Sequence, residues 1–387
     1  MTPPKSLLVS LEFPPQHGGV GNYYYHVCKH LPAGSIVVLA PTSAQAPAFD
    51  VKQPFTIIRE PRLNRLLTPS RLILVNWWRQ WRVYRAIRQS IKVHRVTLLH
   101  VGHVLPLGTI ALLLKRWRKL PYLLYAHGLD ILLPQRSVRK KALLKRIIRQ
   151  AHGLVSNSNF TREALLKLGG RADTIAVVYP CPNLTDTRVP VDRLEHLRRT
   201  HRLDGKRVIL TVGRLVERKG HDQIIRALPA VRQRVPNATY LVVGNGPYRH
   251  RLQQLVNQYR LGEHVTFLDR VDETQLAACF EVCDVFAMPS RQIGPDVEGF
   301  GMVYLEAGLF GKPAVAGESG GATEAVLNNL TGITVNPNDT AAISAALIKL
   351  LTDRAYAGRL GFQAMQRVLE MFTWDHQVEK LQKLLQR

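Results

Sequence analysis

The 387-residue sequence predicts an α/β protein with two domains, each built around a parallel sheet. Single hydrophobic cores stop growing beyond about 250–300 residues, so this length favours two cores. Short apolar, β-rich runs alternate with helical patterns along nearly the whole chain, which is typical of βαβ units. A proline-rich break at residues 179–193 separates two such series.

The apolar runs predict strands in both series. Those of the first series are Ser6–Leu11, Ile36–Pro41, Val96–Val101, Tyr122–His127, Leu154–Ser158 and Ile175–Tyr179. Those of the second are Val208–Gly213, Tyr240–Gly244, Val265–Leu268, Val285–Pro289 and Pro313–Ala316. In the break, Pro180, Pro182 and Pro190 remove backbone donors and disfavour regular structure.

The break and the last helical pattern divide the chain. We predict an N-terminal domain over residues 1–182, a second domain over 183–370 and a C-terminal helix over 371–387. Trp374, Val378, Leu381 and Leu385 share one face of that helix, which makes it a candidate to pack back on the first domain.

The composition, with 46% hydrophobic and 21% charged residues, is that of a globular protein. No run reaches the roughly 18 apolar residues of a membrane-spanning helix, and the first apolar stretch is too short for a signal peptide. We therefore expect a cytoplasmic protein. Four cysteines without a CxxC pair favour buried, reduced thiols over a zinc site, so we predict no metal.

The chain carries 53 Lys and Arg against 28 Asp and Glu, a formal charge of +25 that attracts polyanions. Nucleic acid, an anionic bilayer and phosphorylated substrates are the candidates. Because no RNA or DNA motif is present, basic charge alone would supply only non-specific nucleic-acid binding.

Glycines follow the first predicted strand in FPPQHGGVGNYYYH. Gly18, Gly19 and Gly21 lie between that strand and a helix, where backbone N–H groups and the helix dipole can bind an anion. The spacing is not GxGxxG and no acidic ribose partner follows about 20 residues on, so a plain tight turn remains an alternative.

Charged residues with apolar neighbours mark the second half. Arg214 and Lys219 follow a strand and can converge on a diphosphate, although each alone resembles an ordinary surface charge. Glu298 and Glu306 are eight residues apart, so we expect them on one face of a helix. The apolar residues between them disfavour a solvated acidic face. In the first half, His127 directly follows a strand, which favours a functional histidine.

Seven motifs in this order resemble the GT-B glycosyltransferases of family 4: GGVGNY, AHGLD, NSNFT, GRLVERKG, VGNGP, EGFGMVYLE and SGGATEAV. The resemblance covers essentially the whole chain. It implies two facing Rossmann-like domains with a cleft between them, and transfer of a hexose from a nucleotide-diphosphate donor with retention. No DxD motif occurs, which agrees with a metal-independent enzyme. The segment YPCPNLTD departs from the family's usual Asn-Gly turn and leaves the local linker conformation open.

The resemblance implies roles for matching positions. His127 would hydrogen-bond the transferred sugar, and Arg214 and Lys219 would neutralise the departing diphosphate. Glu298 would hold sugar hydroxyls, and Glu306 the ribose. Three further groups are implied: Gly18 and Gly19 for the donor phosphate in the first domain; Gly299, Phe300, Gly301 and Met302 for phosphates in the second; Gly244, Gly246, Arg270 and Val271 for the base.

One basic helical segment, residues 69–93, carries two stripes. Ile73, Trp77, Tyr84, Ile87 and Ile91 form the apolar one, and Trp78, Trp81, Arg82 and Arg85 form the other. Exposed Trp and Arg residues are typical of a helix at a lipid headgroup boundary, with the basic runs 115–119 and 136–149 in the same domain. The alternative is that these tryptophans complete the core.

Together these features predict a metal-independent, retaining hexosyltransferase, peripheral on the inner face of the membrane. Similarity of RQIGPDVEGFG to GDP-mannose enzymes favours that donor and a lipid-linked or glycan acceptor, and no cofactor is expected. Alternatives are a UDP-sugar transferase with a soluble acceptor and a non-catalytic protein that binds anionic surfaces. A dinucleotide-dependent oxidoreductase fits worst, because GxGxxG and its acidic partner are missing.

Overall fold

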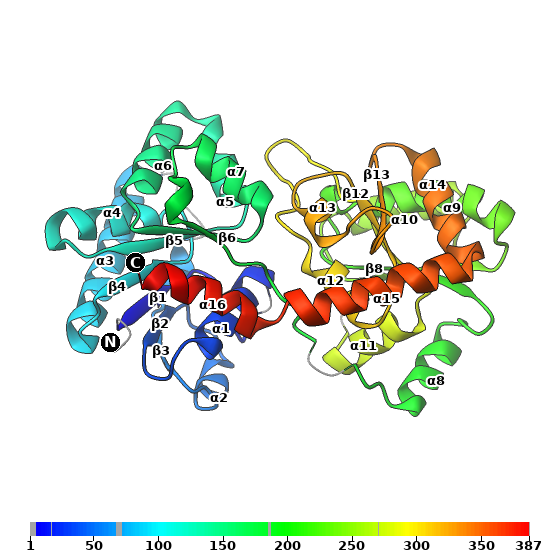
Figure 1. The fold of residues 1–387 in the computed structure, drawn as a ribbon, viewed down its shortest axis with the longest axis horizontal. Helices are drawn as coiled ribbons and strands as arrows, with labels where there is room; N and C mark the ends of the chain where they lie inside the picture. Colours follow the sequence, from blue (N-terminus) through cyan, green and yellow to red (C-terminus); the bar gives the residue numbers. More distant parts are fainter. Residues whose placement is uncertain (1–4, 17, 67–71, 185–186, 270, 387) are drawn as a thin grey trace. The chain divides into compact units, whose positions relative to one another are not determined.

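The structure, a computed structural model, describes residues 5–16, 18–66, 72–184, 187–269 and 271–386. The chain forms two compact units (Figure 1). Unit 1 consists of Met1–Pro180 and Trp374–Arg387, and unit 2 of Cys181–Thr373. The sequence predicts these domain boundaries after residues 182 and 370, which lie two and three residues from the boundaries in the structure.

Unit 1 contains a seven-stranded parallel sheet of order β3-β2-β1-β4-β5-β6-β7. Its strands are β1 (Ser6–Val9), β2 (Ile36–Ala40), β3 (Thr56–Arg59), β4 (Leu98–Val101), β5 (Tyr122–Ala126), β6 (Gly153–Ser156) and β7 (Ile175–Val177). β3 was missed because it is a partly exposed edge strand without a long apolar run. Buried strands were found, but most end one or two residues earlier than predicted, where the site loops begin.

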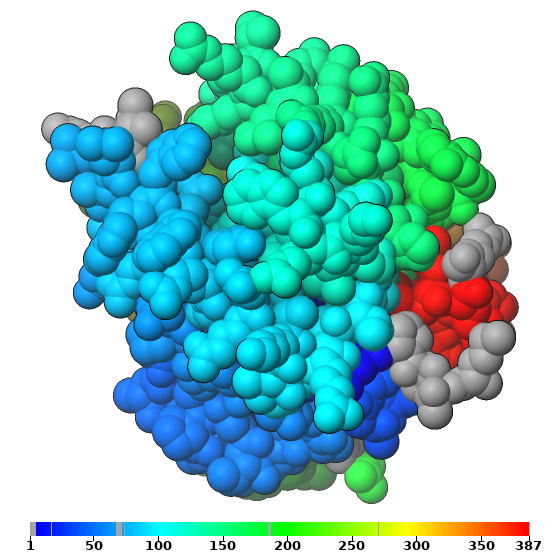
Figure 2. All heavy atoms as spheres, turned by 90° about the vertical axis from the view of Figure 1, so that its left-hand side faces the viewer, coloured from blue at the N-terminus to red at the C-terminus, as the bar shows by residue number. Residues whose placement is uncertain are grey.

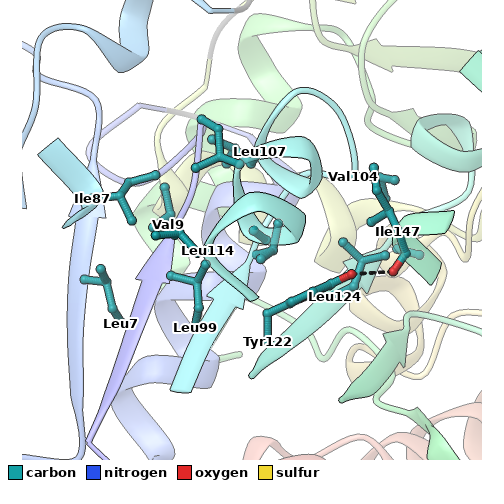
Figure 3. Packing of buried hydrophobic residues seen from close by; sticks show 14 of the residues in the cluster. Leu7, Val9, Ile87, Leu99, Val104, Leu107, Leu114, Tyr122, Leu124 and Ile147 are labelled. Carbon is teal, nitrogen blue, oxygen red and sulfur yellow. Dashed lines mark hydrogen bonds between the residues drawn. The ribbon is translucent and has the colours of Figure 1, made fainter. Parts of the chain in front are cut away.

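Helices surround this sheet: α1 (Gly19–His30), α2 (Ala46–Asp50), α3 (Ile73–His94), α4 (Leu107–Arg118), α5 (Leu129–Leu132), α6 (Val138–Gln150) and α7 (Asn159–Lys167). Figure 3 shows the core on one face, where strand residues Leu7 and Leu99 pack with Ile87 of α3 and Leu114 of α4. The Tyr122 hydroxyl donates to the carbonyl of Ile147 at 2.5 Å (Figure 3), which satisfies the one polar group that this buried ring carries.

The C-terminal helix α16 (Trp374–Leu385) belongs to unit 1. The Trp374 ring stacks on His26 of α1, with centroids 5.0 Å apart. Gln377 is buried and accepts a hydrogen bond from the Tyr179 N–H at 3.0 Å. The buried face ends at Leu384 rather than at the predicted Leu385.

Unit 2 contains a six-stranded parallel sheet of order β10-β9-β8-β11-β12-β13. Its strands are β8 (Arg207–Val212), β9 (Ala238–Val243), β10 (Val265–Leu268), β11 (Val285–Met288), β12 (Ala314–Gly317) and β13 (Gly332–Val335). Its helices are α8 (Val191–Thr200), α9 (His221–Arg234), α10 (Arg249–Gln258), α11 (Glu273–Val282), α12 (Met302–Leu309), α13 (Ala322–Ala325), α14 (Thr340–Thr352) and α15 (Arg354–Met371).

Two expectations in unit 2 were wrong in detail. β13 was missed because its four residues, GITV, are too few for a clear alternating pattern. The irregular break was drawn three residues too long, because Pro190 precedes α8 and the helix already begins at Val191. Pro190 is the residue just before the helix and has an extended ψ of 138°, so its missing N–H costs the helix no hydrogen bond.

Both sheets reverse their strand order beside their first strand, between β1 and β4 in unit 1 and between β8 and β11 in unit 2. In open parallel sheets, ligands bind outside the carboxyl ends of the strands at such a point. The loops after β1 and β4, and those after β8 and β11, are therefore where function is expected in each unit.

Two glycines of α15 give a test of the packing. A Cβ at Gly361 would lie 1.9 Å from the carbonyl oxygen of Gly311, whereas a Cβ at Gly358 meets nothing within 4 Å. We expect Gly358→Ala to stabilise unit 2 by up to about 1 kcal/mol, through helix propensity. Gly361→Ala should lower the free energy of unfolding, measured with urea. Equal stability of the two variants would contradict the close approach.

Candidate functional site

Three charged side chains meet where the loops after β8 and β11 converge. The carboxylate oxygen Oε2 of Glu298 accepts from Lys219 Nζ at 2.8 Å and from Arg218 Nη1 at 2.6 Å. Lys219 ends the short 3₁₀ turn Glu217–Lys219, and Gly220 follows it with φ of 76°. Arg218 was not predicted. Its position beside Lys219 in VERKG was the available signal, but nothing in the sequence showed which cation faces Glu298.

The charge of Glu298 is set by its two partners. Burial alone would raise the pKa of this carboxyl, but the attraction of Lys219 and Arg218 outweighs burial and lowers the pKa to about 2. The carboxylate is therefore ionised at neutral pH and can accept hydrogen bonds from hydroxyl groups.

The expectation that Glu298 and Glu306 share a helical face is wrong. Helix α12 begins only at Met302, after Gly301 with φ of 94°, so Glu298 and Gly299 lie in the preceding loop and only Glu306 is on the helix. The eight-residue spacing misled because a loop and a short helix can also bring two carboxylates close. Gly301 and Met302 do form the start of the helix, and the positive end of a helix dipole favours an anion there.

Glu306 is buried on α12 and accepts a long hydrogen bond, 3.4 Å, from the Asn183 N–H. Burial raises the pKa of Glu306 to about 7, because its effect exceeds the lowering by the Asn183 hydrogen bond and by the positive charge of nearby Lys219. This carboxyl thus titrates near neutrality in the absence of a ligand.

The other predicted residues of unit 2 separate into two kinds. Arg214 is exposed after β8, and its side chain makes no ion pair or hydrogen bond within the described residues, which leaves it available to an anion. Gly244 and Gly246 have a structural reason to be glycine: a Cβ would lie 2.1 Å from the Gly213 oxygen and 2.3 Å from the Leu215 oxygen, respectively. Val271 is half-buried, and Arg270 lies outside the described residues.

In unit 1, the loop after β1 leads into α1 at Gly19. A Cβ at Gly19 would meet nothing within 4 Å, so packing within unit 1 does not explain this glycine and there is room beside it for a ligand. Gly21 is different, because its Cβ would lie 3.3 Å from the backbone of Glu12 and Phe13. Gly18 has an extended backbone with φ of 173°.

His127 follows β5 and is held by three hydrogen bonds. Its Nε2 lies 2.6 Å from the Tyr24 hydroxyl, its N–H donates to Asp130 Oδ1 at 2.9 Å, and its carbonyl accepts from Asn157 Nδ2 at 3.3 Å. Burial, with a smaller contribution from His103, lowers the pKa of His127 to about 3, so the ring is neutral at pH 7.

Known proteins resemble the chain along its whole length. The family model described as Glycosyltransferase Family 4 matches residues 17–185, and the one described as Glycosyl transferases group 1 matches residues 192–367. The GDP-mannose-dependent alpha-(1-6)-phosphatidylinositol monomannoside mannosyltransferase of Mycolicibacterium smegmatis is 32% identical, over 98% of this chain and 97% of its own. A GDP-mannose-dependent monoacylated alpha-(1-6)-phosphatidylinositol monomannoside mannosyltransferase of Corynebacterium glutamicum is 30% identical, over 99% and 98%. The chain belongs to glycosyltransferase family 4.

Solved structures agree on the fold of this family 4 enzyme. HepE of Anabaena in complex with UDP and glucose has a TM-score of 0.80 at 20% identity and covers 99% of both chains. Sucrose-phosphate synthase of Thermosynechococcus elongatus has a TM-score of 0.80 at 22% identity and covers 98% of both. The predicted GT-B class is confirmed, and the protein is a glycosyltransferase that acts with a nucleotide-sugar donor.

Helix α3 belongs to the part of unit 1 that Figure 2 shows in blue and cyan. Three of its tryptophans are exposed. Trp77 is 74% exposed, Trp78 52% and Trp81 53%. Trp77 was wrongly expected on the buried stripe, which instead begins at Val83; the side chain of Ile73 lies outside the described residues. Guanidinium groups of Arg82 and Arg85 lie over the rings of Trp78 and Trp81. Within the described chain, no helix is long and apolar enough to cross a bilayer.

The expectation of buried thiols is confirmed, since all four cysteines are buried and free.

The raised pKa of Glu306 predicts a pH-dependent stability. Between pH 4.5 and about 7 the folded protein keeps a proton that the unfolded chain has lost, so the free energy of unfolding falls as pH rises through this range. The loss should approach about 3 kcal/mol. Urea unfolding of ligand-free wild type and Glu306→Gln at pH 5 and pH 8 should show that the variant gains stability relative to wild type at pH 8.

The exposed Glu263→Gln serves as the control for loss of a carboxylate. If Glu306→Gln and wild type change in parallel with pH, the burial of an ionisable Glu306 does not govern stability.

Proposed function

We propose that this enzyme transfers mannose from GDP-mannose, with retention and without a metal, to a lipid-linked acceptor at a membrane surface. The observation that carries the proposal is the Glu298 carboxylate held ionised between Lys219 and Arg218, with Glu306 buried nearby and Arg214 unpaired within the described residues. Relatives along nearly the full chain, at 30–32% identity, are GDP-mannose-dependent enzymes that act on phosphatidylinositol mannosides.

The charges suit the departure of a diphosphate. When the bond between the sugar carbon and the phosphate oxygen breaks, negative charge builds on the phosphate and positive charge on the sugar ring. Arg214 and Lys219 would stabilise the phosphate charge, which supplies what a divalent ion supplies elsewhere. Glu298 would accept hydrogen bonds from sugar hydroxyls. Because its carboxylate would then be shared between those hydroxyls and Lys219, part of the Lys219 charge would remain available to the phosphate.

Unit 1 carries the features that suit a lipid acceptor and a membrane surface. Arginines of α3 would attract anionic headgroups at long range, while the indole rings would settle at headgroup level and bury apolar area that salt does not screen. The exposure of Trp77, Trp78 and Trp81 supports this role, because core tryptophans would be buried. A lipid-linked acceptor would then be presented where the enzyme binds.

Turnover should depend on the two assigned cations. With GDP-mannose and phosphatidylinositol monomannoside in vesicles, we expect Arg214→Ala and Lys219→Ala to lower kcat by about 10²-fold or more. Arg234→Ala, which removes an exposed arginine at the far end of α9, should leave it unchanged. NMR of the product made by wild type should show that the transferred mannose keeps the anomeric configuration that it has in the donor, as retention requires.

The same assay tests the donor and the metal. GDP-mannose should outperform GDP-glucose, UDP-glucose and UDP-N-acetylglucosamine, and EDTA should not reduce the rate. Activity that is lost with EDTA and restored by magnesium would overturn metal independence, and a preference for a UDP-sugar would overturn the donor.

Membrane binding should require the exposed face of α3. In a flotation assay with vesicles of anionic lipid, wild type should float, and added salt should weaken binding without abolishing it. A variant with Trp78 and Trp81 changed to Ala and Arg82 and Arg85 to Glu should stay in solution. Arg198→Glu with Arg199→Glu, on α8 of unit 2, makes the same change in charge and should still float. Equal flotation of all three proteins would assign the stripe no role at membranes.

A further inference from the structure

Tyr24 joins the first helix to the sugar-site histidine. Tyr24 is on α1, and its side chain is fully buried. Its hydroxyl contacts the carbonyl oxygen of Gly102, after β4, and lies 2.6 Å from Nε2 of His127, after β5. The hydroxyl therefore lies beside two strands at the carboxyl edge of the unit 1 sheet.

The directions of these two hydrogen bonds follow from the donors available. A carbonyl oxygen can only accept, so the single hydrogen of the Tyr24 hydroxyl points to Gly102. The Tyr24 oxygen must then accept from His127, which places a hydrogen on Nε2. Because the ring is neutral, its other nitrogen, Nδ1, carries no hydrogen and presents a lone pair.

We propose that Tyr24 is a positioning residue that fixes His127 as the Nε2–H tautomer, so that Nδ1 accepts a hydrogen bond from a hydroxyl of the transferred sugar. The proposal rests on the proposed function, in which His127 contacts that sugar. It adds the direction of the hydrogen bond and the residue that sets it.

The surroundings hold the tyrosine and the imidazole ring in place. A Cβ at Gly102 would lie 3.1 Å from the Tyr24 ring, so glycine makes room for this tyrosine. Tyr23, the neighbour of Tyr24 on α1, packs edge-on against the His127 ring, with ring centroids 5.2 Å apart. Asp130 accepts a hydrogen bond from the backbone N–H of His127, which holds the main chain from which the ring extends.

An accepting nitrogen makes the site selective. A sugar hydroxyl can donate to Nδ1, whereas a fluorine or a hydrogen at the same carbon cannot, and the nitrogen would then lose its water without gaining a partner. The enzyme should therefore discriminate against a donor modified at one particular hydroxyl.

The tautomer can be measured without any substrate. In ¹⁵N-histidine-labelled wild type, the His127 signals, assigned by their loss in His127→Ala, should show a protonated Nε2 and an unprotonated Nδ1. In Tyr24→Phe the ring loses its acceptor, so the proton should shift toward Nδ1. A protonated Nδ1 in wild type, or the same tautomer in both proteins, overturns the proposal whether or not the donor is GDP-mannose.

Kinetics test the consequence. Across monodeoxy and monofluoro GDP-mannose analogues, one position should cost wild type about tenfold or more in kcat/KM, and Tyr24→Phe should reduce that cost severalfold. Tyr122→Phe, which removes another buried hydroxyl of unit 1 that bonds a carbonyl, should discriminate as wild type does. Equal discrimination by Tyr24→Phe and wild type would overturn the role of Tyr24. If wild type does not use GDP-mannose at all, the proposed donor fails, and the NMR result still decides the tautomer.

Discussion

The buried, ionised carboxylate of Glu298 is the constraint on which unit 2 depends. An ionised carboxylate away from water costs several kcal/mol unless charged partners offset that cost, and removing one partner of such a group is strongly destabilising. Lys219 and Arg218 therefore have to reach Glu298 from another loop. This fixes the loop after β8 against the loop after β11. In the proposed reaction, the cations would be in place before a diphosphate arrives. Little reorganisation is then needed when its charge develops.

Glycines allow the backbones to come close enough for this arrangement. Gly220, directly after Lys219, lies where a Cβ would be 2.2 Å from the Pro289 oxygen, and its φ of 76° suits glycine. A Cβ at Gly320, whose φ is 59°, would likewise lie 2.2 Å from the backbone carbonyl oxygen of Glu298. Two backbones thus approach on either side of the charged cluster, which makes the lengths of the loops, and not only their charged residues, a requirement of the site.

The sequence predicted what depends on local pattern and missed what depends on tertiary contacts. Long buried strands such as β8 and β9 have continuous apolar runs, whereas the edge strand β3 and the short β13 do not. Motif order located the loops of Lys219, Glu298 and His127. It did not show that Arg218 faces Glu298 or that Tyr24 reaches His127, because these contacts join residues 80 and 103 positions apart. Helical spacing was applied to Glu298, which the turn at Gly301 keeps out of the helix.

The two units differ in the kind of polar group that they supply. Unit 2 offers ions: Arg214 is exposed, and Glu298 is kept charged by its partners. Unit 1 offers a group that burial keeps neutral: the pKa of His127 is lowered to about 3, chiefly by burial. This division suits the proposed reaction. An imidazolium beside the sugar would oppose the positive charge that develops on the ring, while a neutral imidazole can hold a hydroxyl without that penalty. In the proposed reaction, burial of His127 would thus do for the sugar what the fixed cations would do for the diphosphate: each would provide, before the reaction, the charge state that the transition state needs.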